Sequence, residues 1–157
     1  MTPIVQSFIL GDLIFPVFMF PLFPTLFALA ALLNLPIDAL VQFVVLRFMH
    51  VKLEREKWFH LLLKLWGIGL LADVIGSILL TGIMFTGLHF DPYDFYTSLF
   101  STSIFFTAIL LSALVIYAFD FRVLKKSCSL RQAKRIALAF AIFTAPYTFL
   151  ISTSWVM

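Results

Sequence analysis

The sequence predicts an all-α integral membrane protein, a bundle of about four transmembrane helices (five as an alternative) forming one domain over residues 1–157. Two observations predict this class. Hydrophobic residues make up 62% of the chain and charged residues only 12%, whereas ordinary soluble domains carry about 25% charged residues. All 11 Lys and Arg residues fall in two short windows, 47–64 and 122–135. A soluble protein would scatter them over its surface.

The two basic windows also predict an orientation. Short loops rich in Lys and Arg are retained on the cytoplasmic side of a membrane. We therefore expect a multi-pass protein of a cell's inner membrane, with both windows in the cytoplasm. The net charge of +3 could suit nucleic acid, but every cation lies beside a predicted membrane boundary, which favours anionic lipid headgroups as the partner. The cations of the second window are expected to contact those headgroups: Lys125, Lys126, Arg131, Lys134 and Arg135.

Three crossings follow from the spacing of charges. Residues 65–88 contain a single charge and residues 95–119 contain none, with a short acidic turn between them. Residues 136–154 are uncharged and follow the second basic window. A bilayer core of about 30 Å needs roughly 20 helical residues, so each stretch is predicted to cross once.

The first 46 residues admit two interpretations. They could form two crossings with a turn at residues 34–36, or one long crossing over 24–46 preceded by an interfacial or re-entrant segment, 1–23. The single crossing is favoured because Asn34, Asp38 and Gln42 recur every fourth residue and would share one helical face. Pro36 would then lie inside a helix, which neighbouring helices in a membrane can tolerate.

Small residues on the 65–88 crossing predict a packing seam. Gly69, Ala72, Gly76 and Ser77 fall close together on one side of that helix. Small side chains let backbones approach where apolar burial gives no drive to associate. This crossing is therefore expected at the centre of the bundle.

Two carboxylates carry the main functional hypothesis. Asp38 lies nine residues before Arg47, and Asp73 lies nine residues after Lys64. At 1.5 Å per residue, each is about 13 Å from its basic anchor, so both could reach the same depth. An unpaired carboxylate there costs at least about 3 kcal/mol. The pair must be protonated, share a proton or hold a cation. Asn34 and Gln42 would add uncharged oxygens, completing a candidate ligand- or ion-binding site.

Other interpretations stay open. Either aspartate could be a protonated structural residue, or Asp38 could cap a helix in the five-crossing alternative. The functional classes are a transporter-like or ion-coupled membrane component, and a non-catalytic subunit, assembly factor or immunity-type protein that binds a partner. A chain this short is expected to form a homo-oligomer or to join a partner membrane protein. No catalytic motif, metal-ligand spacing or cofactor signature is present, so an enzyme is the least favoured class.

Overall fold

The computed structural model describes residues 17–88 and 90–151, and within them the protein is all-α with no strand. A short 3-10 helix, η1 (Val17–Leu22), precedes four α-helices: α2 (Pro24–Phe48), α3 (Arg55–Met84), α4 (Leu99–Leu124) and α5 (Leu130–Phe143). A second 3-10 helix, η2 (Tyr147–Leu150), follows. By length and composition α2, α3 and α4 can each cross a membrane. The predicted class, an all-α membrane helix bundle, is confirmed.

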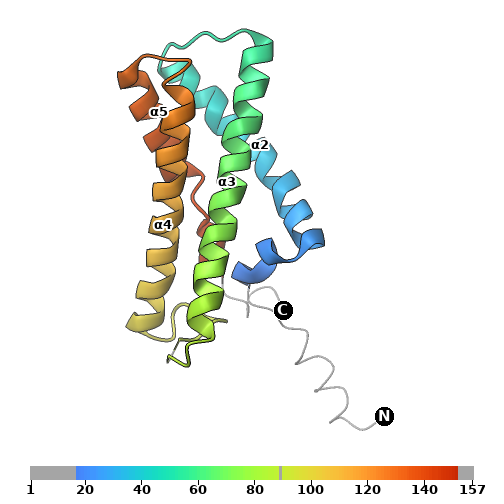
Figure 1. Ribbon diagram of the computed structural model, residues 1–157, viewed down its shortest axis with the longest axis vertical. Coiled ribbons are helices and arrows are strands. Elements are labelled where there is room, and N and C mark those ends of the chain that lie inside the picture. The colour runs from blue at the N-terminus through green and yellow to red at the C-terminus, as the bar shows by residue number, and fades with distance from the viewer. Residues whose placement is uncertain (1–16, 89, 152–157) are drawn as a thin grey trace.

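The four α-helices are arranged as a ring. α3 packs between α2 and α4, while α5 packs against α4 and also contacts α2. Figure 1 shows α3 and α4 lying side by side, with α2 inclined to them and diverging toward the end where η1 lies. η1 contacts both α2 and α3 there. The ring differs from the expectation that α3 would be central, because α5 contacts α2 and closes the arrangement.

The N-terminal helix agrees with the single-crossing alternative. α2 runs without interruption for 25 residues and contains Pro36. Its start is set by Pro24 at the first helical position, where the missing N–H costs no hydrogen bond. Of the expected segment 1–23, residues 1–16 lie outside the described part of the chain. Residues 17–22 form η1, whose Phe18 is 1% exposed and packs among aromatic rings of the bundle.

The next two helices are displaced from their expected bounds. α3 begins at residue 55 rather than 65. The charged residues before the apolar stretch are helical too, so the helix is longer at this end than the predicted membrane crossing. α4 begins at residue 99 rather than 95 because the Ser98 hydroxyl accepts a hydrogen bond from the Ser101 N–H and caps the helix. It ends at residue 124 rather than 119, which draws Asp120 inside the helix.

The last expected crossing, 136–154, is not one continuous helix. α5 has 14 residues, which span only about 21 Å at 1.5 Å per residue. It starts at residue 130 because Ser129 and Gln132 form a capping box. It ends at Phe143, and the chain turns through residues 144–146 into η2. Pro146 cannot continue a helix, because it has no N–H and its ring clashes with the preceding turn. Residues 152–154 lie outside the described part.

Buried apolar residues form two clusters at different levels of the bundle. One joins α2, α3, α4 and α5 near the basic windows and includes Leu65, Ile116 and Phe140. The other joins η1, α3, α4 and η2 and includes Phe105 and Phe149. On α3 and on the C-terminal segment, the first cluster gives way to the second around residues 72–80 and 141–145. The interrupted end of α5 therefore lies at the level between the two clusters.

Part of the predicted small-residue seam packs against α4. Ala72, Gly76 and Ser77 are buried, while Gly69 is half-buried. The Ser112 hydroxyl of α4 donates a 3.0 Å hydrogen bond to the Ala72 carbonyl. A Cβ built on Gly76 would lie 2.6 Å from both the Ser112 Oγ and the Phe149 Cε2. Gly76 therefore lets α4 and η2 reach α3 together.

Candidate functional site

A small pocket that contains two carboxylates in a largely apolar lining lies where three segments of the bundle meet. Its volume is about 180 Å³, below the roughly 300 Å³ at which pockets begin to hold drug-sized ligands. It has room for several water molecules or a partly hydrated ion. The lining comes from α2, from α3 and from the interrupted end of α5: Asn34, Ile37, Asp38, Gly69, Leu70, Asp73 and residues 143–148.

The sequence-predicted acidic residues meet in this pocket. Asp38 is buried, at 6% exposure, and Asp73 is partly buried. The Asn34 side-chain amide lies 3.5 Å from the Asp73 Oδ2, at the long limit of a hydrogen bond. Asp38 and Asp73 are close enough to interact electrostatically. Three of the four predicted site residues therefore lie together, contributed by two antiparallel helices.

Gly69 makes room for one of these carboxylates. A Cβ at Gly69 would lie 3.8 Å from the Asp38 Oδ2, which is an ordinary van der Waals contact. A larger side chain at this position would compete for the space that Asp38 and any bound ion need. Gly69 thus belongs to the pocket as well as to the packing face on which it was predicted.

The end of α5 supplies the third wall. The last carbonyl groups of a helix have no intrahelical N–H partner, and this end carries a partial negative charge. Here the Thr144 N–H and hydroxyl both donate to the Phe140 carbonyl, and the Tyr147 hydroxyl donates to the Ile142 carbonyl. Figure 1 shows the chain leaving α5 in an irregular path before the terminal red segment. Irregular backbone at membrane depth is tolerated where it lines a cavity.

The pocket has acidic side chains and no basic ones. Two carboxylates and a helix C-terminus face it, while its lining contains no Lys, Arg or His. Among the described residues the one ion pair, between Lys57 and Glu54, lies elsewhere. A buried carboxylate without a cationic partner is costly, so the environment disfavours anions and favours a proton or a cation.

Gln42 does not join the site. Its side-chain amide instead donates a 3.0 Å hydrogen bond to the Trp58 carbonyl in the first turn of α3. Its carbonyl oxygen Oε1 is buried and has no hydrogen-bond partner. The i, i+4 spacing predicted the correct helical face for Gln42, but α2 and α3 approach each other at this level and bring Trp58 within its reach.

A third carboxylate was missed by the sequence argument. Asp120 of α4 is fully buried, and neither carboxylate oxygen has a hydrogen-bond partner. It interacts electrostatically with Asp38. Its position near Arg122 made it resemble a boundary charge. The sequence signal that could have identified Asp120 as a buried residue is its four-residue spacing from the apolar Ile116 and Leu124, which places all three on one face of a helix. In the structure Ile116 and Leu124 are both buried.

The remaining predicted residues lie at the surface. All five cations expected to contact lipid headgroups, Lys125, Lys126, Arg131, Lys134 and Arg135, are exposed at the end of the bundle where α4 meets α5. Exposure there is compatible with headgroup contact, which stays a prediction. Within residues 17–88 and 90–151, no group of three or more His, Cys, Asp or Glu residues is arranged to hold a metal ion.

Comparison with known proteins gives no further assignment. No protein-family model, curated protein or solved structure matches the chain. The fold and the pocket define it as a helical membrane bundle with an acidic pocket between α2, α3 and the end of α5.

Proposed function

We propose that this protein is a small ion-coupled membrane component in which Asp38 and Asp73 bind a proton or a monovalent cation. One observation carries the proposal: two carboxylates of apolar helices line the same small pocket beside the end of α5, and that pocket has no cationic side chain. Ionisable residues within membrane-spanning segments commonly mark ion pathways and proton relays. Interrupted helices supply backbone carbonyls for the ions in many transporters.

Asp120 extends the proposed pathway toward the basic end of α4. It lies four residues before the end of that helix and interacts with Asp38, while Asp38 also interacts with Asp73. In the proposed mechanism, Asp120 relays protons between that end of the bundle and the pocket. The pocket is too small for a drug-sized substrate, so any larger cargo would be moved by an oligomer or a partner subunit.

Reconstitution into sealed vesicles tests the proposal. We expect the protein to accelerate proton or monovalent-cation flux, measured with an entrapped fluorescent indicator under imposed H⁺, Na⁺ and K⁺ gradients. Empty vesicles provide the background. Vesicles that contain folded protein but stay at that background under every gradient would contradict an ion pathway in this chain alone. A stoichiometric membrane partner co-purifying with such inactive protein would favour the competing class, a partner-binding subunit.

The proposed orientation places both basic windows in the cytoplasm. Single cysteines at Leu88 and Lys125 test it in a Cys128→Ser background, since both positions are exposed. Burial raises the pKa of the native Cys128 thiol, and its removal leaves a single reactive site. An impermeant maleimide applied to intact cells should modify the cysteine at position 88 and spare the one at 125. The reverse pattern would overturn the orientation.

A further inference from the structure

A second hollow lies at the basic end of the bundle, and on α3 its lining ends at Lys64, five residues before Gly69 of the acidic pocket. Its volume is about 870 Å³. It is bounded by the linker between α2 and α3, by the first turns of α3 and by the turn between α4 and α5. Its lining joins the two basic windows: Lys52, Leu53, Glu54, Lys57, His60, Leu61, Lys64, Val123, Lys126 and Ser127.

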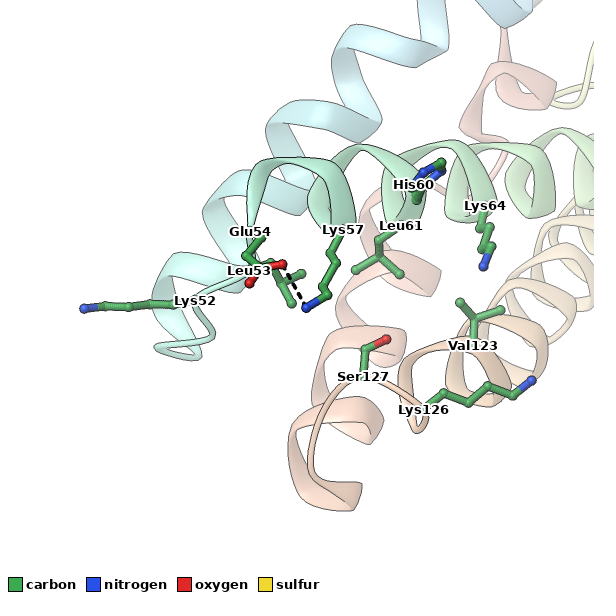
Figure 2. Close-up of a pocket in the computed structure, with 10 residues that line it drawn as sticks. All are labelled: Lys52, Leu53, Glu54, Lys57, His60, Leu61, Lys64, Val123, Lys126 and Ser127. Atoms are coloured by element: carbon green, nitrogen blue, oxygen red, sulfur yellow. Dashed lines mark ion pairs between the residues drawn. The ribbon is translucent and has the colours of Figure 1, made fainter.

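The charge of this hollow is strongly positive. Four lysines and one glutamate line it, which leaves a formal charge of +3 when His60 is neutral. Figure 2 shows Lys57 and Lys64 extending from α3 toward the α4–α5 turn, with Lys126 and Ser127 on the opposite side. Lys57 and Lys64 are seven residues apart, so they lie two turns apart on one face of α3. Lys52 points away from the centre in the same view.

Two further features suit an anion. Glu54 occupies the position before the first turn of α3, and its side chain makes no capping hydrogen bond there. The first N–H groups of α3 therefore have no side-chain cap from Glu54, although Glu56 lies in the first turn of this helix. Glu54 instead pairs with Lys57 at 2.9 Å, and both side chains are well exposed, at 75% and 68%. Such an exposed ion pair is weak, so Lys57 can leave Glu54 and pair with an anion that enters the hollow.

We infer that this hollow binds a phosphate group held between Lys57 and Lys64 of α3 and Lys126 of the α4–α5 turn. Part of its lining is apolar and comes from Leu53, Leu61 and Val123. Cations beside apolar side chains fit the phosphate of a lipid headgroup with its first acyl carbons. Basic pockets between membrane helices bind phospholipid headgroups. A free phosphate compound would use the same cations and leave the apolar side chains unused.

Matched charge variants test the inference on the full-length protein in detergent. Binding of a fluorescent short-chain phosphatidylglycerol is measured for wild type, Lys57→Gln/Lys64→Gln, and a control, Arg47→Gln/Arg55→Gln. The control removes the same number of cations from exposed positions of α2 and α3 that do not line the hollow. Each lysine near an anionic surface contributes roughly a fivefold factor. The hollow variant should therefore bind about 25-fold more weakly, and the control should stay close to wild type.

A third variant changes affinity in the opposite direction. Glu54→Gln removes the single negative charge of the hollow and frees Lys57, so phosphatidylglycerol should bind more tightly. Inorganic pyrophosphate is then added as a competitor. Displacement of the lipid identifies a free phosphate compound as a ligand of the same site, while failure to displace it identifies the headgroup. Equal weakening in both double variants, or no phosphatidylglycerol and no pyrophosphate binding by wild type, would overturn the inference.

Discussion

Replacing Asp73 with asparagine is expected to reduce cation-coupled flux to the level of empty vesicles while the protein stays folded. Asparagine keeps the shape of the side chain and can still form a hydrogen bond with Asn34, which lies 3.5 Å away. It cannot carry the negative charge or the exchangeable proton. If Asp73 is a structural protonated residue, the two side chains are near equivalents and flux should survive.

Further variants sharpen this prediction. Asp38→Asn should have the same effect, and the double variant should be no worse than either single one, because residues acting as one site are not additive. Glu56→Gln is the matched control, since it removes one negative charge from the exposed first turn of the same helix, α3. Wild-type flux in a well-folded Asp73→Asn protein would assign that residue a structural role.

Gly76→Ala is expected to cause the largest loss of stability among single-methyl changes in α3. The added Cβ would lie 2.6 Å from the Ser112 Oγ and from the Phe149 Cε2. Overpacking of this kind costs about 1–3 kcal/mol. Displacing Ser112 would also break its buried hydrogen bond to the Ala72 carbonyl. Displacing Phe149 would disturb η2, which adjoins the pocket.

The matched control for this variant is Gly82→Ala. Gly82 is exposed on the same helix, and an added Cβ would meet nothing within 4 Å. Alanine is favoured over glycine in a helix by about 0.8–1.0 kcal/mol, so this change should be neutral or stabilising. Thermal unfolding in mild detergent measures both. Equal unfolding temperatures for the two variants would show that the α3–α4 seam is misplaced.

The sequence was sufficient to predict the class, the long helices and much of the candidate site. Charge-free stretches locate helices because membrane crossings exclude ions. Asn34 and Asp38 were predicted to share a face of α2, and both line the pocket with Asp73. That agreement depends on helical periodicity and on equal spacing from basic anchors, which are local properties of the chain.

The features that the sequence did not predict are set by contacts between helices and by local interruptions of the chain. Apolar composition alone predicted a continuous last crossing, whereas Pro146 and the preceding turn end α5 at Phe143. Hydropathy could not reveal that this interruption would form a wall of the acidic pocket. Asp120 was missed because a charge near a helix end resembles a boundary residue until neighbouring helices bury it. Gln42 bonds to Trp58, a contact set by the crossing of α2 and α3.

The central claim is that Asp38 and Asp73 together bind a proton or a monovalent cation. Infrared difference spectroscopy of the purified protein, between cation-free and cation-containing buffers and across pH, observes carboxyl protonation directly. We predict that wild type loses a protonated-carboxyl band and gains a carboxylate band as the cation binds or as pH rises. The cation-dependent part of that change should be largely absent from the Asp38→Asn/Asp73→Asn variant, which keeps Asp120 and the exposed carboxylates. A wild-type spectrum whose carboxyl bands do not respond to the cation and show no pH-dependent change beyond that of the double variant would contradict the claim.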